Sequence, residues 1–233
     1  MRFQDAAPDA RAIVYAGIQA DPLVHRAARL LADASPAQRV LARAVMNGET
    51  TDPAAWRTMF PSLIGPSVDS AVRERSEEIL EAALRVADRG EAARSQFRGA
   101  IVESVTERLL ARRVDAATVR RERRILFDGV RAEIHPYDVT VESAAPEAYD
   151  CKWGARGINA DVLLQLGSAR SNAAAEGVDL AVALVVFDAH RSAFVRLARL
   201  PGSTAGIGLV AIETLRSLGR ARPAASTPGR TVS

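Results

Sequence analysis

Lys152 is the only lysine in this chain of 233 residues, and arginine supplies the rest of the Lys+Arg total of 31. It follows Asp150 by two positions, and Asp138 lies a short distance upstream. Side chains alternate along a β-strand, so an extended segment places Asp150 and Lys152 on one face and Cys151 on the other. Two carboxylates that converge repel each other unless a cation lies between them, and such hard oxygen ligands suit Mg²⁺ or Mn²⁺. The sequence therefore predicts a metal site beside a lysine.

The segments around these residues have the pattern of an α/β fold. Short apolar runs predict strands over 124–130, 137–143, 148–154, 180–189 and 193–200. Amphipathic stretches predict helices over 91–113, 159–177 and 206–219. The run from Leu180 to Phe187 is apolar throughout, as expected of a strand covered on both faces. We therefore expect a mixed sheet with helices on its faces, in which a hairpin brings Asp138 beside Asp150.

Residues 1–90 have a different pattern, in which short helices follow one another. The expected helices begin near Asp, Ser or Pro, several end at Gly or before Pro, and they cover 9–20, 22–34, 36–48, 53–60 and 67–90. We expect an all-helical N-terminal region over 1–90, an α/β domain over 91–220 and a disordered tail over 221–233. The N-terminal helices are candidates for a homodimer contact or for binding a protein partner.

Composition excludes several classes of protein. No apolar run reaches the roughly 18 residues of a membrane span, and the first residues lack the apolar stretch of a secretory signal. A single cysteine can form neither an internal disulfide nor a cysteine-rich zinc site. We therefore expect a cytoplasmic protein with no membrane partner. The formal net charge is only +3, but the isoelectric point of about 9.6 is compatible with basic patches that bind nucleic acid.

The acidic residues and the lysine also form a known pattern. The tripeptide Pro-Tyr-Asp ending at Asp138, eleven intervening residues, and Asp-Cys-Lys ending at Lys152 resemble the signature of the PD-(D/E)XK nuclease superfamily. Tyr137 is one extra residue between the proline and the aspartate of that signature. The preceding segment, 97–110, resembles the first helix of the family's fold, which often brings a glutamate to the metal, and Glu103 is the best match.

The resemblance covers about residues 95 to 200 and implies a restriction-endonuclease-like mixed central sheet flanked by helices. It implies an Mg²⁺- or Mn²⁺-dependent nuclease that hydrolyses phosphodiester bonds, with DNA rather than RNA as the expected substrate. The metal ligands that it implies are Asp138, Asp150, Glu103 and the backbone carbonyl of Cys151. Lys152 would orient or deprotonate the attacking water, and Gln165 in the next helix would support the site.

Two of these assignments have competing interpretations. Asp150 and Lys152 could instead form a surface ion pair, which contributes only about 0.2 to 1 kcal/mol. Glu107 lies one helical turn after Glu103 on the same face, so either could be the helix ligand. Gly99 favours Glu103, because a glycine one turn earlier would let the helix approach the sheet.

An arginine-rich segment lies between the expected metal-binding helix and the first expected strand. Its candidates for contacts with a phosphate backbone are Arg120, Arg121, Arg123 and Arg124. A solvated face is the ordinary explanation of such a charge run, and both interpretations stay open. Two other functions are also compatible with the sequence. One is a catalytically inactive nuclease-fold module that binds nucleic acid or an assembly, and the other is a helical protein-interaction adaptor.

Overall fold

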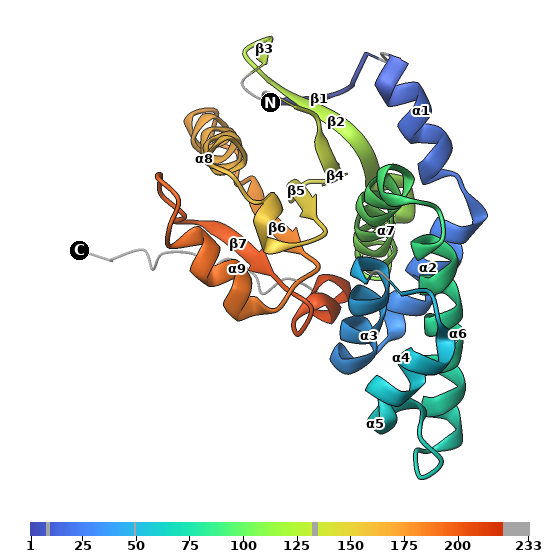
Figure 1. Ribbon diagram of the computed structural model, residues 1–233. Helices are drawn as coiled ribbons and strands as arrows, with labels where there is room; N and C mark the ends of the chain where they lie inside the picture. The colour runs from blue at the N-terminus through green and yellow to red at the C-terminus, as the bar shows by residue number, and fades with distance from the viewer. Residues whose placement is uncertain (8–9, 49, 132–134, 221–233) are drawn as a thin grey trace.

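The computed structural model describes residues 1–7, 10–48, 50–131 and 135–220, and the tail expected over 221–233 lies outside them. Within these residues the chain forms an α/β fold with a mixed sheet flanked by helices, as predicted (Figure 1). The strands are β1 (Arg2–Asp5), β2 (Val119–Phe127), β3 (Val130–Arg131), β4 (Tyr137–Val141), β5 (Glu147–Lys152), β6 (Ala181–Val186) and β7 (Ile207–Val210). The longer helices are α1 (Ala10–Gln19), α2 (Pro22–Asp33), α3 (Pro36–Asn47), α6 (Ser70–Ala87), α7 (Glu91–Leu110), α8 (Ala160–Ala175) and α9 (His190–Leu197). Shorter segments are α4 (Pro53–Met59), α5 (Pro61–Ile64) and the 3₁₀ turns Ala116–Thr118, Ala155–Gly157 and Leu215–Gly219.

The sheet changes from antiparallel to parallel at β5. Its strand order is β1-β2-β4-β5-β6-β7, with β3 paired to β2; the pairs up to β4–β5 are antiparallel, and β5–β6 and β6–β7 are parallel. The β4–β5 ladder aligns Val139 with Tyr149. One step further, the same register places Asp138 opposite Asp150, so the expected hairpin is confirmed.

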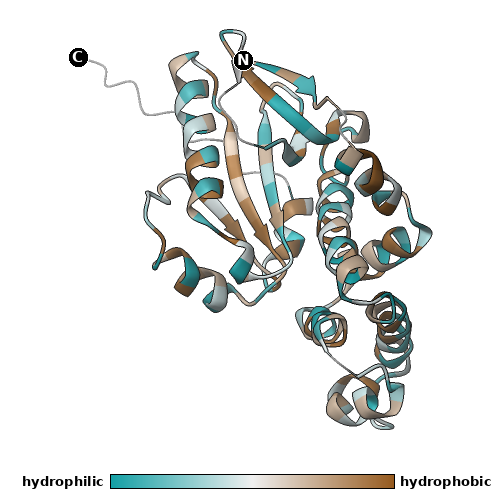
Figure 2. Ribbon diagram, turned by 45° about the horizontal axis from the view of Figure 1, so that its top comes forward, coloured by the Kyte–Doolittle hydropathy of each residue, from teal (hydrophilic) through white to brown (hydrophobic). Residues whose placement is uncertain are grey.

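Helices cover both faces of the sheet. Residues with side chains on one face, such as Val139 and Cys151, share a core with α7, while Ala148 and Leu184 on the other face pack with α8 residues such as Leu166. Figure 2 shows hydrophobic colour along one central strand, hydrophilic colour on its neighbour, and mixed colour around the helices. The apolar sequence of β6 is expected of a strand buried on both sides, and mixed helices are expected of elements buried on one side. The α7 helix therefore lies directly over the strands that carry the acidic residues.

The N-terminal helices begin where the sequence predicts. At the start of α2, Asp21 accepts a hydrogen bond from the Leu23 N–H. At the start of α3, Ser35 and Gln38 form a reciprocal capping box. Both helices have proline at the first helical position. Helix α2 packs on α7, and α3 packs on α6. Residues such as Leu31 belong to the same core cluster as Val139 of the sheet.

The expectation that residues 1–90 are all helical is wrong at the N-terminus. Arg2–Asp5 forms β1, an edge strand whose residues pair antiparallel with β2, from Arg2 with Leu126 to Asp5 with Arg123. The segment is short and mostly exposed, so it has little hydrophobic pattern. Its strand conformation comes from backbone hydrogen bonds to a distant partner.

The last two expected elements of the fold are exchanged. Segment 193–200, predicted as a strand, lies mostly in helix α9, whose first N–H, that of His190, donates to the Glu213 carboxylate at 3.0 Å. Segment 206–219, predicted as a helix, contains β7 and a 3₁₀ turn, and β7 pairs parallel with β6 through Val182 and Ile207.

Among the described residues, no helix is both long and apolar enough to cross a membrane.

Candidate metal centre

Three acidic residues form a row across three neighbouring strands. Asp138 of β4 lies opposite Asp150 of β5, and on its other side the β2–β4 register, which pairs Arg121 with Val139 and Arg123 with Tyr137, places Glu122 opposite Asp138. Beyond the last β4–β5 ladder pair, the N–H of Cys151 donates to Asp138 Oδ2 at 2.5 Å. This bond fixes the Asp138 carboxylate between the two strands.

Helix α7 adds a fourth carboxylate, Glu103, beside Glu122 and Asp138 of this row. Oxygen atoms of Glu103, Glu122 and Asp138 all lie within 4.8 Å of one another, a spacing at which one ion can contact all three. Burial raises the pKa of Asp138 well above its ordinary range, and the charges of Asp150 and Glu103 raise it further. Burial and the Glu103 charge raise the pKa of Glu122 to about 7. A cation would relieve this mutual repulsion.

Glu122 is a member of the cluster that the sequence did not predict. Its backbone has a φ of 53°, in the left-handed region that is uncommon for residues other than glycine. Arg121 forms an ion pair with Glu107 of α7, while the next residue, Glu122, lies beside Glu103 of the same helix. Consecutive side chains of a regular strand would point to opposite faces, so the left-handed residue lets both reach α7. Strained backbone of this kind occurs often at functional sites.

Glu103 is buried, and α1 holds it in place. Tyr15 Oη donates to Glu103 Oε1 at 2.5 Å, and Gln19 Nε2 donates to Oε2 at 2.7 Å. Burial, followed by the charge of Glu103, raises the pKa of Tyr15, so the phenol stays protonated as a donor. The expected role of Gly99 is wrong, because a Cβ at that position would lie 3.0 Å from Tyr15 Oη. The glycine makes room for α1 rather than for the sheet.

Asp150 and Lys152 form an ion pair that is not on the surface. Lys152 Nζ lies 2.6 Å from Asp150 Oδ1, and their side chains are 24% and 10% exposed. Burial lowers the pKa of Lys152, but the charges of Asp138 and Asp150 outweigh it and raise the pKa above the ordinary lysine value. The lysine stem packs against Gly157, where a Cβ would lie 3.2 Å from Lys152 Cδ. Asp150 therefore contacts the lysine, and it is not part of the 4.8 Å group found among the described residues.

The remaining predicted site residues lie around this centre. Glu107 is paired with Arg121 and does not belong to the 4.8 Å group. Gln165 forms two hydrogen bonds with the backbone of His135: it donates to the carbonyl at 2.9 Å and accepts from the N–H at 3.1 Å. The buried Cys151 thiol lies on the opposite face from the ion pair, 3.5 Å from Thr106 Oγ1.

The four candidate nucleic-acid contacts divide into two kinds. Arg121 is paired with Glu107, and Arg123 pairs with Asp5 and, at 2.5 Å, with Glu142. Arg120 is exposed, whereas Arg124 is partly buried and lines a cavity beside the centre. Arg121 and Arg123 thus have carboxylate partners within the fold.

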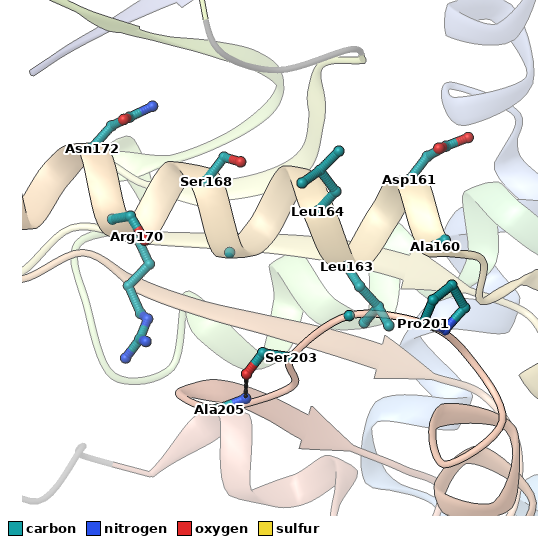
Figure 3. Close-up of a pocket in the computed structure, with 13 residues that line it drawn as sticks. Ala160, Asp161, Leu163, Leu164, Ser168, Arg170, Asn172, Pro201, Ser203 and Ala205 are labelled. Carbon is teal, nitrogen blue, oxygen red and sulfur yellow. Dashed lines mark hydrogen bonds between the residues drawn. The ribbon is translucent and has the colours of Figure 1, made fainter.

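A larger cavity lies elsewhere, between α8 and the loop around Pro201 and Ser203. Its volume is about 790 Å³, and Figure 3 shows Arg170 and Leu163 extending from α8 toward that loop. None of the clustered carboxylates lines it. The larger cavity is therefore separate from the candidate centre.

The donor set fits a hard divalent cation. Carboxylate oxygens are the ligands that Mg²⁺ and Mn²⁺ prefer, and Mg²⁺ is commonly held by one or two carboxylates together with water and substrate phosphates. The cluster supplies three, with the Asp150–Lys152 pair beside them. Comparisons of the chain with protein-family models, curated proteins and solved structures give no match.

Proposed function

We propose that this chain is a metal-dependent nuclease with a restriction-endonuclease-like core, which hydrolyses phosphodiester bonds in DNA rather than RNA. The observation that carries the proposal is the acidic row Glu122, Asp138 and Asp150. Glu103 lies beside Glu122 and Asp138, and Lys152 forms an ion pair with Asp150. The order α7, β2, β4, β5, α8, β6 supports it, because a helix, three antiparallel strands, a helix and a parallel strand agree with the superfamily resemblance.

Glu103, Glu122 and Asp138 would hold Mg²⁺ or Mn²⁺, since their oxygens already lie together. When bound, the ion polarises a phosphodiester and offsets the negative charge that develops during its hydrolysis. Lys152 remains an ammonium group, because Asp138 and Asp150 stabilise its charge. It therefore orients a water molecule or a phosphate oxygen by donating hydrogen bonds, and Asp150 holds it in position.

A second function is favoured by one observation. Both oxygens of Glu103 already accept hydrogen bonds from α1, which reduces their capacity to bind a cation. A nuclease-fold module that binds nucleic acid without cleaving it needs no metal ligand at this position, so both oxygens of Glu103 could remain hydrogen-bonded to α1. In the nuclease, by contrast, Tyr15 and Gln19 orient Glu103, as supporting hydrogen bonds commonly orient metal ligands.

The deciding experiment measures nicking of supercoiled plasmid by purified protein in Mg²⁺ or Mn²⁺, with and without EDTA. The test variant is Asp138→Asn, which keeps the size of the side chain and an acceptor for the Cys151 N–H. Asp179→Asn is the matched control, because Asp179 is exposed and remote from the cluster.

Nicking that requires the cation, disappears in Asp138→Asn and persists in Asp179→Asn would support the nuclease. DNA binding without nicking in either cation would favour the inactive module. A protein that neither nicks nor binds DNA would refute both functions.

A further inference from the structure

A cavity of about 630 Å³ adjoins the candidate metal centre beneath α1. One wall is the face of α1 that carries Ala12, Tyr15, Ala16 and Gln19, which recur at the spacing of one helix face. Tyr15 and Gln19 also donate to Glu103, and Glu122 lines the cavity as well. The cavity therefore shares three residues with the surroundings of the carboxylate cluster.

The cavity wall combines apolar surface with positive charge. Ala12, Ile13 and Ala16 supply small or branched apolar side chains, and Ile13 is 64% exposed. Arg11 and Arg124 supply guanidinium groups from two different elements, α1 and β2. An apolar wall with flanking cations near a carboxylate cluster matches a ligand with a flat base at one end and phosphate at the other.

The size of the cavity selects one form of nucleic acid. Pockets that enclose a small molecule have volumes of about 300 to 1,000 Å³, and this cavity lies within that range. A duplex instead covers an open protein surface of about 1,000 Å² or more, and its bases remain stacked inside the helix. Enzymes that enclose a base act on an unpaired or extruded nucleotide.

We propose that this cavity holds one unpaired nucleotide of a DNA strand, with the adjoining backbone phosphate at the carboxylate cluster. The substrate class is then a single strand or an unpaired end rather than an intact duplex. This inference rests on the proposed function for the position of the phosphate, whereas the fit of the nucleotide to the cavity can be tested by binding alone.

The test compares Ala16→Trp, which fills the cavity from α1, with Val14→Trp, which adds the same side chain to the same helix at a position that is 59% exposed and outside the cavity lining. Fluorescence anisotropy in EDTA measures binding of labelled oligothymidylate and of a blunt DNA hairpin, so that cleavage does not contribute. We expect the wild type to prefer oligothymidylate, and Ala16→Trp to weaken that binding at least about tenfold, as loss of one base-stacking position would. Val14→Trp should bind as the wild type does.

A second variant guards against misfolding caused by the large tryptophan. Arg11→Gln leaves the cavity open and should weaken binding of oligothymidylate mainly at low salt, because one phosphate contact is lost. Equal binding of hairpin and single strand by the wild type, or equal losses in Ala16→Trp and Val14→Trp, would overturn the cavity proposal. Discrimination between the two tryptophan variants without any cleavage by the wild type would support the cavity and count against the nuclease. If Ala16→Trp cleaves the single strand as well as the wild type does, the result would support the nuclease and overturn the cavity proposal.

Discussion

Replacing Lys152 with arginine tests whether the one lysine of the chain does chemistry. The change preserves the positive charge, and arginine would serve Asp150 in a simple ion pair at least as well. The structure gives the guanidinium little room, because the lysine stem packs on Gly157 and Nζ lies 2.6 Å from Asp150 Oδ1. A planar guanidinium fork cannot occupy the position of a compact ammonium group between Gly157 and Asp150, and it directs its hydrogen bonds differently.

Two magnitudes separate the chemical role from the structural one. The Lys152 side chain is 24% exposed, so the larger group can move outward, and we expect the free energy of unfolding to fall by only about 1 kcal/mol. For a chain of this length that corresponds to a decrease of roughly 2–4 °C in Tm. Loss of the group that orients the attacking water or the phosphate lowers the rate about 10² to 10⁴-fold, which is about 2.7 kcal/mol or more in the activation barrier.

The assay is single-turnover cleavage by wild type and Lys152→Arg at equal folded concentration and saturating Mg²⁺, with thermal unfolding measured on the same samples. Arg156→Lys, a charge-preserving exchange at an exposed position nearby, is the matched control. A rate within about threefold of the wild type would refute the assigned role, since it would show that any cation at position 152 suffices.

Three further predictions concern the charges around the centre. In EDTA, the free energy of unfolding should fall as pH rises from about 4.5 to 7, because the folded protein retains a proton on Glu122 that the unfolded chain has lost; urea titrations of Glu122→Gln should show a shallower dependence. Asp138→Asn should leave metal-free stability equal or higher, because it removes repulsion, and should abolish any rise in Tm on adding Mn²⁺; a marked fall in metal-free Tm would contradict this. Arg123→Gln should lower the free energy of unfolding by about 1 to 3 kcal/mol, because its bonds to Glu142 are lost. Arg120→Gln, at an exposed position, should leave Tm unchanged and reduce the salt dependence of DNA binding. A lower Tm in Arg120→Gln and an unchanged Tm in Arg123→Gln would contradict this assignment.

The sequence predicted those parts of the fold that local pattern determines. The caps of α2 and α3 and the continuous apolar run of β6 are set by residues close to each other in the chain. The pairing of Asp138 with Asp150 also followed, because a short connection between two strands favours a hairpin. Segment 193–200 and β7 could not be assigned in the same way, because a short apolar run is compatible with either a helix or a strand until its partner is known.

The carboxylate cluster needed information that the local sequence does not contain. Glu122 stands among four arginines, ahead of the strand predicted over 124–130, and only the β2–β4 register places it beside Asp138. Tyr15 is 88 positions away from its acceptor Glu103, so no spacing rule could connect them. The signal that the sequence does contain is that Glu122 is the one acidic residue of β2.

The arrangement of these charges argues for a role beyond stability. Glu122, Asp138 and Asp150 lie in a row across three adjacent strands, and burial raises the pKa of all three. The charge of Glu103 raises the pKa of Glu122 and of Asp138 further. A core chosen for stability alone would place apolar side chains there, because buried ionisable groups are commonly neutral or unfavourable compared with apolar residues of similar volume. Here the backbone also adopts a left-handed conformation at Glu122, which keeps its carboxylate on the side of α7. The fold thus bears both electrostatic and conformational costs to hold Glu103, Glu122 and Asp138 together beside the Asp150–Lys152 pair. A cation bound among the three carboxylates would offset the electrostatic cost and use the geometry that the strain maintains.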